Sequence, residues 1–142
     1  MYQRLVLVGN LGRDPEMRYT PNGTAVTSLS VATSRRYTTA DGQAKEETAW
    51  FRVSVWGKQA EPCNQYLAKG RKVLVEGVLV PDENGGPRIW TGSDGKPRAS
   101  FEVRATTVRF LDSKRDSAPG AGVGGAPETA MEEPTNSEEL PF

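Results

Sequence analysis

The chain has 142 residues, and its 18 Lys and Arg residues balance 18 Asp and Glu residues, but the charges are segregated along the sequence. Residues 1–111 hold 16 basic and 11 acidic residues, a net charge of +5, whereas residues 112–142 hold 2 and 7, a net charge of −5. The second part is rich in Gly, Ala, Pro, Ser, Thr and Glu and has too few apolar residues for a core. The composition therefore excludes two globular domains and predicts one domain over 1–111 with a disordered tail over 112–142.

The residue types also narrow the chemistry. The sequence has no His, which removes the usual general base and the commonest metal ligand. Cys63 has no partner for an intrachain disulfide, and it fits a small buried apolar residue better than a nucleophile. No apolar run approaches the ~20 residues of a membrane helix, and residues 5–8 are too few for a secretory signal. We therefore expect a cytoplasmic protein with no cofactor, no metal site and no membrane contact.

The first elements in chain order are predicted β-strands. Residues 4–9 form a short apolar run that indicates a strand buried on both faces and followed by a bend. After the turn signal at residues 21–23, residues 25–37 are rich in Val, Thr and Ser without a helical period. They lead to a hairpin signal at residues 40–42, and residues 48–56 form the third predicted strand.

One helix is predicted after the third strand. Within residues 58–69, Ala60, Cys63 and Leu67 recur at helical spacing, and Gly70 follows as a stop signal.

Two further strands complete the predicted fold. Residues 72–80 are strongly β-prone, residues 81–87 form a polar Gly/Pro loop, residues 88–91 are short and extended, and residues 100–111 alternate again. The order favours an all-β, five-stranded Greek-key barrel of the OB type, with one helix between the third and fourth strands. The strand count alone also fits an immunoglobulin-like sandwich, but the helix in mid-chain argues against it.

The third strand has an unusual outer face. Alternation puts Phe51, Val53 and Val55 on one side, a core face, and Trp50, Arg52, Ser54 and Trp56 on the other. Two indoles outside the core need a partner, and another element or a subunit that covers them is one explanation. The six positions between the two rings span ~20 Å at ~3.3 Å per residue, so the rings suit an extended ligand rather than one small molecule.

Aromatic rings interleaved with basic residues match single-stranded nucleic acid, because bases stack on rings and cations neutralise phosphates. Tyr37 and Trp90 lie at strand ends next to polar loops, where they could stack on bases or simply pin their own hairpins. Each basic residue taken alone also fits a solvated surface charge. The predicted phosphate contacts are Arg4, Arg18, Arg35, Arg36, Arg52, Lys58, Lys69 and Arg88.

The order of several motifs resembles the bacterial single-stranded DNA-binding protein family across the whole first domain. The motifs are Leu-Val-Gly-Asn-Leu-Gly-Arg-Asp-Pro-Glu-Met-Arg-Tyr at 7–19, Pro-Asn-Gly at 21–23, Trp-Phe-Arg-Val at 50–53, Trp-Gly-Lys at 56–58, Tyr66, Leu67, Lys69 and Gly70, and Val-Glu-Gly at 75–77. The resemblance implies an OB fold, usually a homotetramer, that covers DNA during replication, recombination and repair.

The resemblance also implies that four aromatic positions stack on bases, and the matching residues are Tyr37, Trp50, Trp56 and Trp90. The sequence departs from the family pattern at residues 37 and 51. Tyr37 replaces the usual Trp, and Phe51 stands where a His often lies near a subunit contact. The change at Phe51 concerns how subunits assemble. The loop at 81–87 concerns how far the last hairpin reaches.

The end of the tail is a second predicted site. An otherwise polar segment closes on Glu138, Glu139, Leu140, Pro141 and Phe142. A chance hydrophobic end is one explanation, and a peptide ligand whose ring, carboxylate and acidic residues meet a basic pocket is the other. This end is similar to the acidic tip through which the family recruits helicases, nucleases, primosome proteins and recombination mediators. We also expect the tail to compete weakly with DNA for the basic domain.

An enzyme is disfavoured because the sequence offers no phosphate loop, no metal-ligand cluster and no nucleophile with a base. An RNA-binding OB module of the cold-shock kind uses a similar surface, but such domains are usually shorter and lack this tail. A primosomal relative of the same fold lacks the acidic tip. The tail and a preference for DNA over RNA separate these alternatives.

Overall fold

Seven strands and one short α-helix follow one another in residues 1–112, the part of the chain that the computed structural model describes. The helix, α1 (Ala60–Tyr66), follows a 3-10 turn, η1 (Gly57–Gln59), and lies between the fourth and fifth strands. The predicted all-β class with one helix is confirmed. The strands are β1 (Leu5–Leu11), β2 (Glu16–Tyr19), β3 (Ala25–Thr38), β4 (Ala44–Trp56), β5 (Lys72–Leu79), β6 (Arg88–Thr91) and β7 (Pro97–Phe110).

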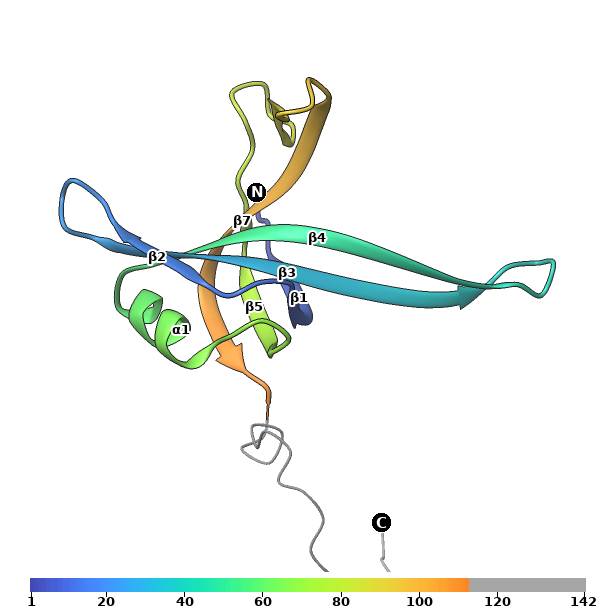
Figure 1. Cartoon of the computed structure of the whole chain (residues 1–142), viewed down its shortest axis with the longest axis horizontal. Helices are drawn as coiled ribbons and strands as arrows, with labels where there is room; N and C mark the ends of the chain where they lie inside the picture. Colours follow the sequence, from blue (N-terminus) through green and yellow to red (C-terminus); the bar gives the residue numbers. More distant parts are fainter. Residues whose placement is uncertain (113–142) are drawn as a thin grey trace, which may run out of the picture.

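Five of the strands close into a barrel in the order β1, β5, β7, β4, β3 (Figure 1). The ring closes because β3 pairs back to β1 through Asn10 with Ala32 and Leu11 with Val31. All pairings in the ring are antiparallel except that of β4 with β7. The remaining strands are additions, since β2 pairs with β3 and β6 pairs with β7.

The barrel core follows from period-two alternation in each strand. The side chains that point inward are aliphatic, and most are fully buried. Cys63, predicted to be a small buried apolar residue, belongs to the core, as does Leu67, and Ala60 is also buried. The core cluster consists of Leu7, Leu11, Leu29, Val31, Val53, Val55, Cys63, Leu67, Val73, Val75 and Val103.

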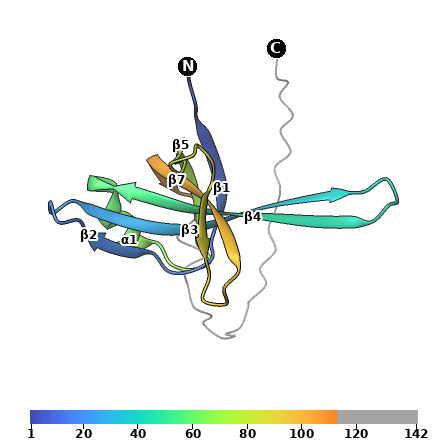
Figure 2. The ribbon, with the colours of Figure 1, turned by 90° about the horizontal axis from the view of Figure 1, so that it is seen from above.

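Two hairpins extend beyond the barrel. In Figure 2 the far ends of β3 and β4 project sideways as a two-stranded ribbon, which we call the projecting ribbon (residues 34–48). Its turn is the predicted one, with Gly42 at a φ of 79° and its N–H donating to the carbonyl of Thr39. The hairpin of β6 and β7 forms the second extension, at the top of Figure 1.

The structure corrects several predicted boundaries. β2 was not predicted, because its four residues are mostly exposed and carry no apolar alternation. β4 begins at Ala44 rather than at residue 48, because pairing continues down the ribbon to Thr38. The helix is confined to Ala60–Tyr66, shorter than the predicted 58–69, and β7 begins three residues early at Pro97.

The first strand is also different from its prediction. We expected both faces of residues 4–9 to be buried, but Val6 and Val8 of β1 are 54% and 51% exposed. Only the inward face, with Leu7 and Leu11, enters the core. The described chain therefore leaves an apolar outer face on β1 without a cover.

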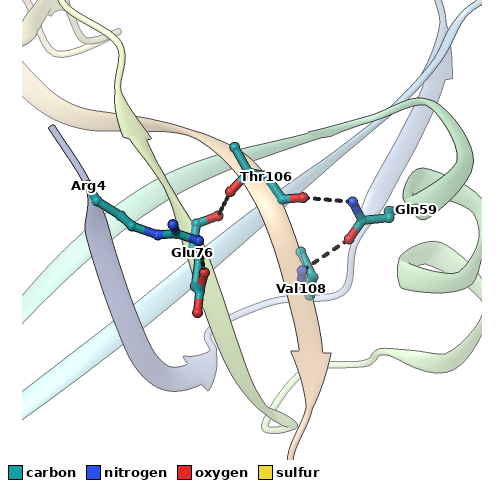
Figure 3. A network of polar contacts seen from close by, with 5 residues as sticks. All are labelled: Arg4, Gln59, Glu76, Thr106 and Val108. Carbon is teal, nitrogen blue, oxygen red and sulfur yellow. Dashed lines mark hydrogen bonds and ion pairs between the residues drawn. The ribbon is translucent and has the colours of Figure 1, made fainter. Parts of the chain in front are cut away.

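Gln59 completes the barrel wall where β4 stops (Figure 3). The pairing of β4 with β7 ends at Ser54 and Arg104, and the next part of that edge of β7 has no strand beside it. There the Gln59 amide nitrogen donates to the carbonyl of Thr106 at 2.9 Å, and its oxygen accepts from the N–H of Val108 at 3.1 Å. One side chain thus replaces the peptide group of a neighbouring strand.

Replacing Gln59 with Glu keeps the acceptor for Val108 but removes the donor to Thr106. We expect Gln59→Glu to lower the free energy of unfolding by about 1 kcal/mol, since the carbonyl loses its partner and faces a carboxylate. Urea denaturation measures the change. Gln65→Glu on the exposed side of α1 is the matched control, and equal stability of the two variants would contradict this role of Gln59.

Candidate nucleic-acid interface

The outer face of β4 carries two half-exposed indoles. Trp50 is 52% exposed and Trp56 is 43% exposed, while Val53 and Val55 point into the core. The alternation predicted for this strand is therefore confirmed. We call Trp50, Arg52, Ser54 and Trp56 the β4 row.

The Trp50 ring rests on the backbone of Gly12. A Cβ at Gly12 would overlap the six-membered part of the indole, so only glycine leaves room for the ring in this position. Gly12 is itself fixed, because its N–H donates to the carbonyl of Ser30 at 2.9 Å. The six-membered edge of the indole therefore packs against Gly12, while Trp50 stays 52% exposed, which leaves ring surface accessible for stacking.

Neighbouring strands extend the β4 row with polar and basic side chains. Arg18 of β2 lies in register with Val26 of β3, which in turn pairs with Trp56. On the other side of β4, Ser54 lies in register with Arg104 of β7. Arg104 was missed by the sequence analysis, because nothing in the sequence shows which residues of two strands 50 positions apart become neighbours. Its side chain is exposed beside the β4 row.

The third indole lies on the β6–β7 hairpin. Trp90 is 45% exposed, and the guanidinium carbon of Arg98 lies 5.6 Å from its ring centroid. Arg88 is two residues before Trp90 and thus on the same face of β6. Arg88 also reaches Glu102 of β7, which is the register partner of Arg52. Trp90 and Arg88 therefore continue the outer face that the β4 row begins.

Tyr37 is on a different face. Tyr37 pairs with Lys45 in the projecting ribbon, beyond the core of the barrel. Strict alternation puts its side chain on the face opposite that of Trp50. Its hydroxyl donates to a carboxylate oxygen of Glu47 at 2.9 Å, which raises the pKa of the phenol. Arg35 lies over the ring at 5.1 Å and forms an ion pair with the same Glu47 at 3.4 Å. The structure does not bring Tyr37 together with the three indoles.

The remaining predicted phosphate contacts are spread over the surface. Arg36 is on the same side of the ribbon as Trp50 and pairs with Glu46 at 3.0 Å. Lys58 lies in η1, two residues after Trp56. The backbone N–H of Lys69 donates to Asp14 at 2.8 Å, which holds Lys69 beside the turn between β1 and β2. Arg4 is set apart, because it precedes β1 on the far side of the barrel.

There Arg4 forms an ion pair with Glu76 of β5 (Figure 3). Hydrogen bonds to Tyr2 and Glu76 raise its pKa. The structure therefore places Arg4 apart from the β4 row.

The one cysteine of the chain lies in an environment that lowers its reactivity. Cys63 is buried, and loss of hydration raises the pKa of its thiol to about 11, which keeps it protonated at neutral pH. Residues 1–112 contain no group of three or more acidic or Cys side chains placed to hold a metal ion. No helix within that range is long and apolar enough to cross a membrane. The predicted tip, Glu138 to Phe142, lies outside the described residues.

Comparison with known proteins gives the family. A model of the single-strand binding protein family matches residues 2–111. The chain belongs to this family. The single-stranded DNA-binding protein of Wolinella succinogenes is 42% identical over 125 residues, which cover 88% of this chain and 70% of that protein. The protein of the same name from Helicobacter hepaticus is 38% identical over 114 residues, 80% of this chain and 64% of its own length.

Solved structures of single-stranded DNA-binding proteins have the same barrel. A deletion mutant of the single-stranded DNA-binding protein from Thermus aquaticus has a TM-score of 0.61 at 33% identity, over 78% of this chain and 51% of that one. The Plasmodium falciparum SSB in complex with ssDNA has a TM-score of 0.65 at 25% identity, over 79% of this chain and 97% of that one. The OB-type barrel predicted from the order of the strands is thus confirmed.

The support of Trp50 by Gly12 is open to a direct test. We expect Gly12→Ala to displace the indole and shift the intrinsic Trp emission, with the fold retained in far-UV circular dichroism and a stability loss of ~1 to 3 kcal/mol from overpacking. Gly86→Ala is the control, because a Cβ there meets nothing closer than 3.9 Å. An unchanged emission spectrum in Gly12→Ala would contradict the placement of the Trp50 ring.

Proposed function

We propose that this chain binds single-stranded DNA with little sequence preference and covers it during replication, recombination and repair, as a non-enzymatic protein. The observation that carries the proposal is the continuous outer face on which Trp50, Trp56 and Trp90 alternate with arginines. Stacking on such rings contributes ~1 to 3 kcal/mol per base and tolerates any base. The names of the relatives, and the ssDNA in the Plasmodium complex, support this ligand.

Basic residues around the three rings supply the electrostatic part of the proposal. Arg18, Lys58 and Arg104 flank the β4 row and make no ion pair with another side chain of residues 1–112. They are available to phosphates without first giving up a carboxylate. Each phosphate neutralised on a single strand adds about −0.7 to the slope of log affinity against log salt. Binding by this face should therefore weaken steeply as salt rises.

The position of Tyr37 bears on the path of the DNA. Trp50 and Tyr37 lie on opposite faces of the β3–β4 pair, so a strand that reached both rings would pass around the edge of the projecting ribbon. Arg36 lies on one face of that edge and Arg35 on the other. We propose this wrapped path for DNA that engages all four predicted rings.

The tail completes the proposed function. We propose that the tip of the tail, residues 138–142, recruits replication and repair proteins. Its support is the sequence itself: an acidic segment that ends in Leu, Pro and Phe suits an aromatic pocket with a basic rim. A protein with this role would be found on the nucleoid in the cytoplasm.

We also propose that the chain assembles as a homotetramer. Val6 and Val8 form an exposed apolar strip on β1, and such strips on a sheet are commonly covered by a partner. A second apolar group lies at one end of the barrel, where the Phe51 ring is 5.8 Å from that of Phe101, itself 52% exposed. Phe51, where the family often has His, is therefore compatible with an apolar contact between subunits.

Titration with oligo-dT tests the proposed ligand. We expect binding to quench the Trp fluorescence, to weaken with salt, and to exceed binding of duplex DNA and oligo-U. Trp56→Ala should lose ~1 to 3 kcal/mol, about 5-fold to 150-fold in affinity. Tyr66→Ala is the control, because that ring is 61% exposed on α1, away from the β4 row. Normal affinity in Trp56→Ala would remove the ring from the interface, and stronger binding of oligo-U would favour an RNA-binding module.

The proposed assembly can be measured by light scattering. We expect four chains per particle for the wild type and a smaller particle for Val8→Glu, because a charge on the apolar strip cannot be buried without a partner. Ile89→Glu makes the same chemical change at a residue that is 67% exposed on β6 and should leave the mass unchanged. A monomeric wild-type protein, or a tetramer that survives Val8→Glu, would count against this interface.

A further inference from the structure

One carboxylate, that of Glu102, lies between two arginines of the DNA-binding face. Glu102 is on β7, and its side chain is 20% exposed. One of its oxygens is 3.4 Å from a terminal nitrogen of Arg88 on β6 and 4.0 Å from a terminal nitrogen of Arg52 on β4. The hydroxyl of Ser100 donates to the same oxygen at 3.4 Å. Glu102 thus faces both arginines, while an adjacent hydroxyl stabilises its charge.

The two arginines occupy central positions in the proposed path. Arg52 lies between Trp50 and Trp56 in the β4 row, and Arg88 lies two residues from Trp90. A strand of DNA whose bases stack on these rings would carry its phosphates past both guanidinium groups. Glu102 is consequently an anion within the part of the face where anions of the ligand must arrive.

Glu102 and a DNA phosphate require the same donors. A guanidinium group that binds a phosphate has to loosen its contact with the carboxylate, and the carboxylate left behind then repels the phosphate. The ion pairs are partly exposed and therefore weak, so a phosphate can displace them. The carboxylate does not block binding but makes the free energy of binding less favourable.

Two carboxylates of the projecting ribbon pair with arginines in a different way. Glu46 and Glu47 each hold a single arginine on the projecting ribbon, with side chains 47% and 58% exposed. Water screens these pairs more than it screens Glu102. Glu102 is the least exposed of the three and serves two arginines from two strands.

We propose that Glu102 acts as an internal competitor of DNA phosphate and sets the affinity of the face below the value that its arginines would give. This inference rests on the proposed binding of single-stranded DNA. The competition favours release, because the carboxylate recaptures both guanidinium groups as the phosphates leave. Glu102 is therefore an affinity-determining residue that needs no contact with the ligand.

The test compares Glu102→Gln with the wild type by fluorescence titration with oligo-dT. The amide has nearly the same shape and still accepts from Ser100, so thermal melting should show a folded protein. We expect roughly 3-fold to 10-fold tighter binding at low salt, from one unit charge removed beside the phosphates, and a steeper salt dependence. The dissociation rate should fall in proportion. Glu61→Gln removes the same charge on α1 and should change little.

A double variant separates competition from general electrostatics. In Arg52→Gln/Glu102→Gln the gain from Glu102→Gln should shrink, because one of the two guanidinium groups that it releases is absent. Equal or weaker binding by Glu102→Gln, beside a wild type that binds oligo-dT, would overturn the competition and leave the proposed function standing. A wild type that does not bind oligo-dT would overturn both.

Discussion

The arrangement of this domain depends on four residue pairs that join β4 and β7 in parallel, from Phe51 with Phe101 to Ser54 with Arg104. Residues in register point to the same side of a sheet. Val53 and Val103 therefore meet in the core, while Arg52 and Glu102 meet outside. A slip of one residue in this pairing would exchange the two faces of the strand and bury charged groups. Packing of the core therefore determines the register, and the register in turn determines which side chains lie on the polar face. The short pairing thus joins two neighbouring strands of the barrel and positions the indoles of β4 relative to the β6–β7 hairpin.

The sequence was most informative where burial and chemistry alternate along one strand. The faces of β4 could be predicted because Val53 and Val55 alternate with residues that no core would accept, and the helical spacing of Ala60, Cys63 and Leu67 identified the helix. Arg104 and Glu102 could not be found in the same way, since their neighbours are set by a parallel contact between distant strands. The face of Tyr37 could have been derived from the sequence. A turn centred on residues 40–42 pairs Thr38 with Ala44, which determines the register of the ribbon and therefore which residues share a face.

The misread face of β1 has a different cause. Val6 and Val8 belong to an unbroken apolar run, and such runs are typical of strands covered on both sides. In residues 1–112, the structure covers Leu7, Gly9 and Leu11 on the other face of this strand but leaves Val6 and Val8 exposed. A sequence pattern reports that a face is apolar, whereas the covering partner can belong to the same chain or to another. The outer face of β1 is accordingly the place where the fold of the chain and its proposed assembly meet.

The projecting ribbon differs from the barrel in what stabilises it. Beyond residue 33 its two faces have no core beneath them, and the side chains that pair across it are polar or charged: Arg36 with Glu46, Tyr37 with Glu47 and Ser34 with Thr48. Cross-strand pairs of this kind contribute only ~0.2 to 1 kcal/mol each. The tip can therefore fray, bend or twist at an energy far below that of global unfolding. A barrel with such an arm combines a rigid surface for Trp50 and Trp56 of β4 with a compliant one for Tyr37, so that curvature of the ligand is accommodated at the arm while the spacing of these two indoles stays constant.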